Sequence, residues 1–585
     1  MILINGQFPG PTIEANWGDY IEVTVHNNIT GPEEGTSLHW HGMLQKETPW
    51  MDGVPSISQC PIAPGSTFVS VTRFSKLSTL ALTKDFRYRF KADIFGTGWY
   101  HSHYSAQYLA GVAGPLVIYG PAHTQFDEDL GPIMLADCKS QHDQLNQGGS
   151  TNRIQGSILH TSHLCKTVRL KQIELFEEVA DLILVMSSNT SIQSPSTNNI
   201  MIDGRMPFNC SLGVPKGSTC SADGSYSKFR VQTGKTYKLR LVNSGAGSLL
   251  YFSIDNHQLT VIANDFVDIQ PYNATQVVLG TGQRSDVLFT PTGNGTIWMR
   301  TIAFGKFCGA SRALQTRAKA IIFLNDTPES ASLPTTSAWP DPVDNGLCSN
   351  VSPISKATSE QALIKLQDPL NKTIPYYPLA LPEPSVTYNI TINQFVNATG
   401  QKLFYMNGNS FQGDYNDPVL LLAEQKNYSY PYDPKWNVVN FGTNTSIRIV
   451  VYNNNTSPHP MHLHGHDFYV LHDGAGPWDG VSIVRPENPQ RRDTHNLAPF
   501  GHMVIQFDAD NPGTWPFHCH IAFHLSQGLF MTFMERPTDI NQLQIPQVMA
   551  QTCTDWDAYS SKNVVEQIDS GLRRRARERV VRKHL

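Results

Sequence analysis

Short stretches that alternate apolar and polar residues recur along the chain and predict β-strands with one buried face. Three of them are Tyr20–Val25, Tyr237–Val242 and Ser446–Tyr452, and each precedes an asparagine, as if one strand-and-turn unit occurred three times. Glycine (43) and proline (38) punctuate the chain throughout, and long amphipathic helical patterns are scarce. The pattern therefore predicts an all-β protein built as a threefold array of β-sandwiches.

Two places where the strand pattern gives way mark the expected domain boundaries. The first is near residues 120–130, and the second is the polar, Pro- and Ser-rich stretch 335–375. A chain of 585 residues is long enough for three or four domains. We predict three domains and a basic C-terminal tail, at residues 1–125, 126–335, 336–572 and 573–585.

Two segments look foreign to this pattern. Val69–Asp85 interrupts what would otherwise be one continuous strand, and Lys139–Glu178 is polar and basic without clear periodicity. Both could be ordinary surface loops. We favour the hypothesis that both are untranslated sequence retained in a faulty gene model, which peptide mapping of the natural protein would test.

Composition narrows the classes of partner. Apolar residues make up 40% of the chain and charged residues 16%, which suits a well-buried globular protein. The net charge of −5 and the pI near 6.5 give no sign of a nucleic acid or an anionic membrane as partner. No apolar run approaches the roughly 20 residues that span a bilayer. We expect a monomer that acts on small molecules.

Other features indicate a secreted, extracellular protein, although the chain opens without a cleavable signal peptide, which we interpret as an incomplete N-terminus. Eight of the nine cysteines are widely scattered, as expected for disulfides in an oxidising compartment. Acceptor sites for N-glycosylation recur along the chain, for example at Asn28, Asn189, Asn273, Asn294, Asn371, Asn389, Asn397 and Asn444.

Histidines separated by one residue are far more frequent than chance allows. The 21 histidines should form only about 0.75 His-X-His pairs at random. The sequence has five, namely His39/His41, His101/His103, His462/His464, His464/His466 and His518/His520. Residues two apart on a strand point to the same face, so each pair can offer two imidazoles to one metal site.

The tripeptide His518-Cys519-His520 joins a thiol to such a pair. Neutral imidazole suits copper, and a thiolate added to two imidazoles makes a blue electron-transfer copper centre. In extended backbone the two histidines face one way and Cys519 the other. One tripeptide can therefore touch two metal sites, with Cys519 as the electron conduit, and His459 and His524 are candidates to complete the cysteine-bound copper.

Four segments carry a resemblance to the multicopper oxidases, and specifically to the laccases of ascomycete fungi. They read HWHGMLQKETPWMDGVPSISQCPI from His39, GTGWYHSHYSAQYLAGVAGPLVI from Gly96, HPMHLHGH from His459 and HCHIAFHLSQGLFMTFME from His518. With the flanking sequence the resemblance covers nearly the whole chain apart from the two foreign segments. It implies three sequential cupredoxin-like Greek-key β-sandwich domains and four copper ions.

The resemblance also implies which residue binds which copper. It assigns His459, Cys519 and His524 to the type 1 copper, and His39 and His462 to the type 2 copper. It assigns the type 3 pair to His41, His101, His103, His464, His518 and His520. His466 matches no ligand, and we interpret it as structural.

Three further positions bear on reactivity. Leu529 stands ten residues after Cys519, where electron-transfer copper proteins often have a weak methionine ligand, so we predict a three-coordinate type 1 copper with a raised potential. Asp52 matches an acidic residue that would assist proton delivery to reduced oxygen, although a turn residue is the alternative. The resemblance implies that His524 faces the substrate. Ser244–Ser248, where the family would carry an acid that accepts a phenolic proton, contains none.

The resemblance extends to processing and disulfides. Asp569-Ser570-Gly571-Leu572 is similar to the mature C-terminus of ascomycete laccases, so cleavage after Leu572 is expected. A disulfide between Cys60 and Cys553 is implied, whereas Cys308–Cys348 and Cys210–Cys220 are weaker suggestions. Cys138 and Cys165 lie beside or inside the second foreign segment and are left unassigned.

These features predict a laccase, which oxidises small phenolic or related aromatic molecules one electron at a time and reduces O2 to water. Another multicopper oxidase, such as a ferroxidase, an ascorbate oxidase or a pigment oxidase, is an alternative on the same scaffold. A copper-binding wall protein without catalysis is a second alternative, but such members would be expected to lose ligands, and all eleven ligand positions are filled here. A third is that this translation, with its foreign segments, does not fold into active enzyme.

Overall fold

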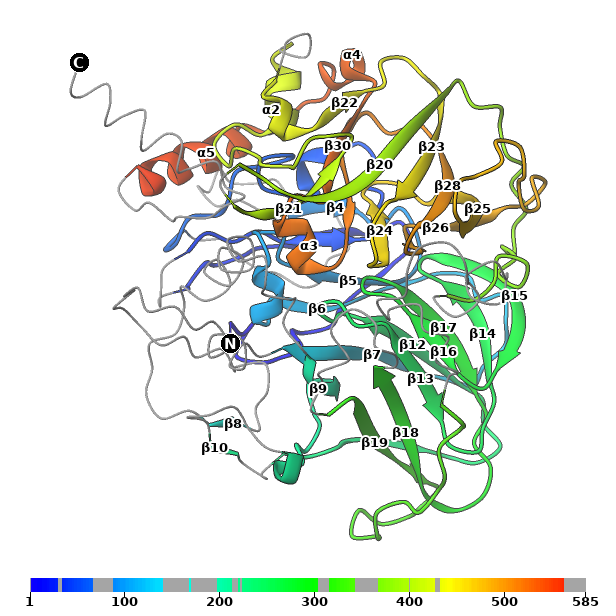
Figure 1. Ribbon diagram of the computed structural model, residues 1–585. Helices are drawn as coiled ribbons and strands as arrows, with labels where there is room; N and C mark the ends of the chain where they lie inside the picture. Colours follow the sequence, from blue (N-terminus) through cyan, green and yellow to red (C-terminus); the bar gives the residue numbers. More distant parts are fainter. Residues whose placement is uncertain are drawn as a thin grey trace.

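The computed structural model describes residues 2–29, 34–66, 88–139, 168–169, 197–212, 219–220, 224–303, 315–341, 367–398, 400–426 and 432–561. Within these residues the strands form sheets that group into three sandwiches along the chain. In Figure 1 the second sandwich, in green, fills the lower part of the view, and the third, in yellow and orange, the upper part. The predicted all-β array is confirmed.

The first sandwich consists of a four-stranded and a two-stranded sheet. The four-stranded sheet has the order β1 (Ile13–Asn16), β6 (Ala113–Tyr119), β5 (Gly96–His101) and β3 (His39–His41). The smaller sheet pairs β2 (Tyr20–Val23) with β4 (Tyr88–Lys91).

The second sandwich packs a sheet of five strands against one of six. The first has the order β11 (Ser227–Val231), β19 (Arg317–Leu324), β18 (Gly295–Ala303), β13 (Leu250–Ile254) and β16 (Val277–Leu279). The second has the order β15 (Val267–Ala274), β14 (Leu259–Asn264), β17 (Arg284–Phe289), β12 (Tyr237–Asn243), β7 (Glu128–Lys139) and β9 (Thr197–Ile202). A separate pair joins β8 (Val168–Arg169) to β10 (Thr219–Cys220).

The third sandwich again combines six strands with five. The larger sheet has the order β21 (Lys402–Met406), β20 (Val386–Val396), β23 (Ser446–Asn453), β28 (Gly501–Asp508), β25 (Phe468–Ala475) and β26 (Gln490–Arg492). The other has the order β22 (Val438–Asn440), β30 (Phe530–Glu535), β29 (Gly513–Cys519), β24 (His459–Leu463) and β27 (Thr494–Leu497).

Helices in the described residues are short and lie mostly near the C-terminus. They are α2 (Val419–Glu424), α3 (Ala522–Ser526), α4 (Pro537–Ile540) and α5 (Gln547–Ser560). Single 3-10 turns occupy Pro49–Met51, Gln107–Ala110, Cys210–Leu212 and Pro434–Trp436. None of the helices found in this part of the chain has the length and apolarity needed to cross a membrane.

Each sandwich has its own apolar core, as the alternating pattern predicts. In β12 the residues Tyr237, Leu239 and Leu241 face the core of the second sandwich and are at most 1% exposed. The core of the first sandwich also takes in side chains from the third part of the chain, among them Leu420 and Met534. This shared burial docks the first sandwich firmly against the third.

An asparagine has the same role in each sandwich: Asn27 follows strand β2, and Asn243 and Asn453 are the last residues of strands β12 and β23. Asn27, Asn243 and Asn453 are at most 1% exposed. In each, the side-chain oxygen accepts from the backbone N–H two residues later, and the side-chain nitrogen donates to two carbonyl oxygens. The hydrogen bonds close the turn without leaving a buried polar group unpaired. The strand-and-turn unit expected from the sequence thus recurs three times.

The two foreign segments predicted from the sequence fall almost entirely outside the described residues. Val69–Asp85 lies entirely outside the described residues. Of Lys139–Glu178, only Lys139, which ends β7, and Val168–Arg169 are described. The hypothesis of retained untranslated sequence therefore stays a prediction. The exact domain boundaries also stay predictions.

Candidate metal centre

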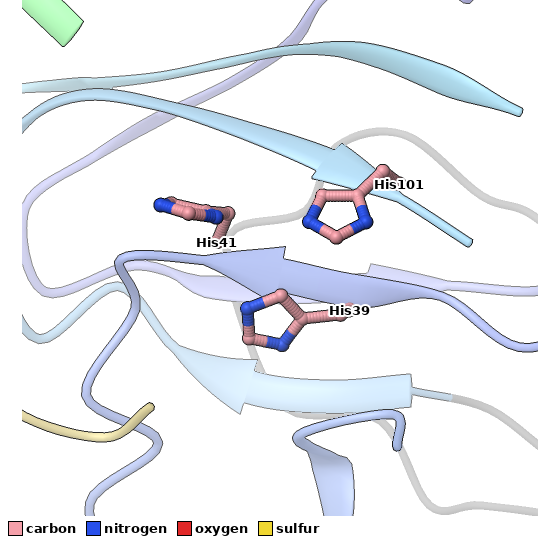
Figure 2. Close-up of side chains that lie close together, drawn as sticks. All are labelled: His39, His41 and His101. Atoms are coloured by element: carbon pink, nitrogen blue, oxygen red, sulfur yellow. The ribbon is translucent and has the colours of Figure 1, made fainter. Parts of the chain in front are cut away.

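Strand register brings the histidine pairs of two sandwiches together. In the first sandwich β3 and β5 are antiparallel, with His39 opposite His101. In the third, β24 and β29 are antiparallel, with His462 opposite His518. Figure 2 shows the imidazoles of His39, His41 and His101 close together beside their strands. Residues far apart in the sequence thus meet where the first and third sandwiches are docked.

One group contains the thiol. Cys519 Sγ lies 3.4 Å from His459 Nδ1 and 3.6 Å from His524 Nδ1, and the two nitrogens are 3.2 Å apart. Strand β24 carries His459, strand β29 ends at Cys519, and helix α3 carries His524. Leu529 is fully buried in the same apolar cluster as Cys519. A thiol and two imidazoles within reach of one point form the donor set of a blue copper centre.

The other eight predicted ligands form a second, larger group. His518 Nε2 lies 3.0 Å from His464 Nε2 and 3.4 Å from His103 Nε2. On another side His520 Nε2 lies 3.1 Å from His41 Nδ1. Every member is at most 6% exposed. The eight are His39, His41, His101, His103, His462, His464, His518 and His520.

Hydrogen bonds fix the tautomer of half of these imidazoles. Four Nδ1 atoms lie 2.8–3.0 Å from backbone carbonyl oxygens, to which they donate: His39 to Asp52, His101 to Ser102, His462 to Asp493 and His518 to Cys519. The opposite nitrogen then presents its lone pair to the group. Among the described residues, Nε2 of His39, His101 and His462 has no hydrogen-bond partner.

The chemistry of the group fits a bound metal. Burial is the main cause that lowers the pKa of His41, His101 and His462 well below the ordinary value, and it lowers the pKa of His518 and of His459 to about 3. These five imidazoles are therefore neutral, which is the form that binds copper. Buried lone pairs without donors cost free energy, and a cation shared among them removes that cost.

Asp52 lies within the larger group, closer to the ligands than its sequence position alone implied. Its carboxylate oxygens lie 2.9 Å from His464 Nδ1 and 3.2 Å from His39 Nδ1, and the side chain is fully buried. Burial raises the pKa of Asp52 above its usual value, although the neighbouring His39 lowers it in part. The residue caps the 3-10 turn Pro49–Met51, as the turn interpretation expects, and its role in proton delivery stays a prediction.

Sequence reasoning missed Asp493, which supports the group from the third sandwich. Its carboxylate lies 3.2 Å from His41 Nε2, and its backbone oxygen accepts the proton of His462 Nδ1. Arg284, from the second sandwich, forms an ion pair with the same carboxylate. No spacing rule links Asp493 and Arg284 to the histidine pairs, so only the fold reveals these contacts.

The segment Ser244–Ser248 lies against the helix that carries His524, where the sequence analysis sought an acidic residue. The backbone oxygen of Ala246 accepts from Ala522 N at 3.3 Å. An acid does stand behind this segment, on strand β7. Asp137 accepts from Ala246 N and, at 2.6 Å, from Ser248 Oγ, and it is 3% exposed. Its oxygens hold the segment in place.

One of the disulfides predicted from the sequence is confirmed, and the others stay predictions. The disulfide between Cys60 and Cys553 is present, with an S–S distance of 1.98 Å, and ties the first sandwich to helix α5. Cys519 is a buried thiol that takes part in no disulfide among the described residues. Cys210 is disulfide-bonded, whereas its pairing with Cys220 stays a prediction. Cys308, Cys348, Cys165 and the segment Asp569–Leu572 lie outside the described residues, as does the side chain of Cys138.

His466 pairs with a glutamate, Glu535, and not with either histidine group. Its Nε2 lies 3.0 Å from a carboxylate oxygen of Glu535, and its Nδ1 lies 3.0 Å from the backbone oxygen of His464. Glu535 is the main neighbour that raises the pKa of His466, against the effect of burial. The contacts agree with the structural role expected for this histidine.

Comparison with known proteins agrees with this geometry. Sequence models described as multicopper oxidase match residues 1–80 and 77–123, 176–323 and 384–539. The chain is 33% identical over 585 residues to "Oxidoreductase OpS5" of Beauveria bassiana, covering 98% of this chain and 84% of that protein. It is 32% identical over 609 residues to "Laccase" of Neurospora crassa, covering 100% and 82%.

Among solved structures, the laccase of Botrytis aclada superimposes with a TM-score of 0.75 at 28% identity, covering 97% of this chain and 90% of that one. The likeness confirms that the sandwiches are cupredoxin-like. The family binds four copper ions of types 1, 2 and 3, and the two buried groups fit them. With matching segments in all three sandwiches and relatives aligned over almost its full length, the chain belongs to the multicopper oxidase family.

Proposed function

We propose that the chain is a laccase, an oxidase that removes single electrons from phenolic or related aromatic molecules and reduces O2 to water. The observation that carries the proposal is the position of the tripeptide His518-Cys519-His520. The Cys519 thiol belongs to one buried group and the two flanking imidazoles belong to the other. Cys519 and its two neighbours in the sequence therefore link the group suited to accepting electrons from substrate with the group suited to reducing O2.

We assign the ligands as follows. The type 1 copper is held by His459, Cys519 and His524, and the type 2 copper by His39 and His462. The type 3 pair is held by His41, His101, His103, His464, His518 and His520. When bound, copper supplies one-electron redox chemistry at each of these positions.

Exposure supports His524 as the residue that substrate contacts. Its side chain is 6% exposed, whereas that of the other imidazole beside Cys519, His459, is fully buried. The Ala246 backbone next to helix α3 forms part of the same neighbourhood. Because Ser244–Ser248 carries no acid, the proton of a phenol would leave to solvent, which favours donors that lose a proton easily.

The proposed path for electrons leads from Cys519 to the flanking His518 and His520. The Cys519 backbone oxygen accepts a hydrogen bond from His518 Nδ1 at 3.0 Å. This hydrogen bond adds a second connection to the covalent backbone that joins the two residues. Asp52 contacts His464 and His39 and is the group that we propose to supply protons where oxygen is reduced. The surrounding carbonyl oxygens hold the imidazoles rigidly, so little rearrangement accompanies electron transfer.

We also propose that the protein is secreted and works as a monomer. The Cys60–Cys553 disulfide supports an oxidising compartment. Five of the glycosylation acceptors, Asn28, Asn273, Asn294, Asn371 and Asn389, lie on the surface, where a glycan could be attached.

The test is expression of the chain with copper, followed by a visible spectrum and oxygen uptake with a simple diphenol. We expect a blue thiolate band and oxygen consumption without peroxide. Parallel assays with Fe(II) and ascorbate test the ferroxidase and ascorbate oxidase alternatives, and faster turnover of either would replace the laccase assignment. A copper-loaded protein that oxidises no donor would support the copper-binding wall protein.

Replacement Cys519→Ser is the control for the type 1 assignment. The smaller hydroxyl is a poor copper ligand, so the blue band should vanish while the copper of the larger group stays bound. Circular dichroism identical to that of the unmodified protein would show that the fold is intact. A blue band that survived the replacement would rule out the assignment.

A further inference from the structure

A loop of the second sandwich reaches the larger histidine group, although that sandwich contributes no histidine to it. The loop follows strand β16 and runs from Gly280 to Arg284, the first residue of strand β17, and we call it the 280–284 loop. All five of its residues are buried. It crosses from the second sandwich to the junction of the other two.

Arg284 fills this junction with a two-pronged ion pair. Its Nη1 and Nη2 atoms donate to the two carboxylate oxygens of Asp493 at 2.7 and 2.5 Å. Its Nε atom donates to the backbone oxygen of Thr97, on strand β5 of the first sandwich, at 2.9 Å. Arg284 is fully buried and Asp493 is 1% exposed. One guanidinium thus binds the first and third sandwiches at once.

The charges around this pair are balanced. Asp265 also contacts Arg284 at 3.3 Å, and Arg492 pairs with Asp265 at 2.9 Å. Asp493 is held in a fixed orientation, because two parallel hydrogen bonds to a planar guanidinium allow little rotation. Removing the fork would leave a buried carboxylate beside the imidazoles with no fixed direction.

Asp493 passes this orientation on to two histidines. Its carboxylate lies 3.2 Å from His41 Nε2, so the opposite atom, Nδ1, faces His520. Its backbone oxygen accepts the proton of His462 Nδ1 at 2.8 Å, so His462 Nε2 faces the group. Arg284 therefore influences the orientation of both imidazoles indirectly, through Asp493.

Two other residues of the loop act on the same group. Gln283 Nε2 donates to the backbone oxygen of Thr494 at 2.9 Å, and the Thr494 hydroxyl lies 3.1 Å from His462 Nδ1. Gly282 has a φ of +88°, and an added Cβ would lie 2.8 Å from Cδ2 of His520. Only glycine allows the loop to approach the imidazole so closely in this conformation.

We propose that the 280–284 loop is a positioning element of the three-copper centre, through which the second sandwich sets the geometry and copper affinity of a site whose ligands belong to the other two. Arg284 orients Asp493, Gln283 orients Thr494, and Gly282 sets the spacing against His520. The proposal rests on the proposed function, because it takes His41, His462 and His520 as ligands. It predicts that the loop affects the type 2 and type 3 coppers and leaves the type 1 copper unchanged.

The test compares Arg284→Lys with a matched control, Arg300→Lys. Arg300 also forms a two-pronged pair, with Asp255 at 2.7 and 2.8 Å, but this pair lies within the second sandwich. Lysine keeps the positive charge and removes the fork in both variants. The readouts are copper per chain, the type 2 signal in electron paramagnetic resonance, the blue band, and copper affinity by competition with a chelator.

We expect Arg284→Lys to keep the blue band, to lose or shift the type 2 signal, and to bind the copper of the larger group about 10–100-fold more weakly. Arg300→Lys should match the unmodified protein in all four readouts. Four tightly bound coppers and an unchanged type 2 signal in Arg284→Lys would overturn the proposal. An equal loss of type 2 copper in Arg300→Lys would also overturn it, because the effect would then be general destabilisation.

Gln283→Ala covers the case in which Arg284→Lys fails to fold. It removes the hydrogen bond to Thr494 without disturbing a buried charge, and it should broaden or shift the type 2 signal while the blue band remains. An unchanged signal in this variant would count against the loop. If the unmodified protein itself showed no type 2 signal after copper loading, the proposed function would fail, and that outcome is distinct from failure of the loop proposal.

Discussion

The buried carboxyl of Glu34 should make the stability of the protein fall as pH rises. Glu34 lies before strand β3, where Gln107 Nε2 donates to its carboxyl oxygen at 2.6 Å. Burial raises the pKa of Glu34 from 4.5 to about 7, although this hydrogen bond lowers it in part. Replacement Glu34→Gln keeps an oxygen that accepts from Gln107 and removes the titration.

The sign and the magnitude follow from the raised pKa. Because the folded protein holds this proton more tightly than the unfolded chain, the stability contribution is full below pH 4.5 and is lost as the pH rises to about 7. Each pKa unit corresponds to about 1.4 kcal/mol, so the full shift would be about 3 kcal/mol. Partial exposure of the side chain reduces this figure through solvent screening, and we expect about 2 kcal/mol.

The assay is the melting temperature of the copper-loaded protein and of Glu34→Gln at matched scan rates from pH 4 to pH 8. Subtracting one from the other at each pH removes the titration of all other groups. Because the entropy of unfolding grows with chain length, the variant should gain about 2 °C over the unmodified protein between the two ends of this range. Glu383→Gln, at an exposed position, is the control and should show a flat difference. A flat difference for Glu34→Gln would refute the reasoning.

Three further changes test the metal centres. Leu529→Met places a thioether beside the Cys519 group and should lower the type 1 reduction potential, measured by redox titration of the blue band; an unchanged potential would mean that the side chain does not reach the copper. Asp52→Asn removes a buried carboxylate between His464 and His39 and should slow oxygen reduction about 100-fold, seen in stopped-flow reoxidation, with reduction of the blue copper unaffected; equal slowing of both steps would contradict a proton-delivery role. Removal of copper with a chelator leaves buried imidazole lone pairs unpaired, so calorimetry should show a lower melting temperature, and an unchanged one would argue against metal binding in the larger group.

Local pattern predicted much of the fold and of the ligand set. The strands β2, β12 and β23 follow from alternation over a few residues, and the buried asparagines Asn27, Asn243 and Asn453 mark the turn after each of them. The histidine pairs were recognisable for a similar reason, because residues two apart on a strand point to the same face of the sheet.

What could not be predicted depends on contacts between distant parts of the chain. Asp493 and Arg284 are 209 residues apart, and neither stands in a motif that indicates a metal centre. Their importance arises only when three sandwiches dock and bury both charges. The closeness of Gly282 to His520 is of the same kind, because a glycine in a turn gives no sign of what lies across the interface.

The larger histidine group is divided evenly between the two ends of the chain. Four of its members come from residues 39–103 and four from residues 462–520. A growing polypeptide therefore carries half of a metal-binding site through most of its synthesis, with no means of holding the metals until its last sandwich has folded and docked. Copper uptake by the larger group would then report completion of the whole chain, and a truncated product would hold no copper there.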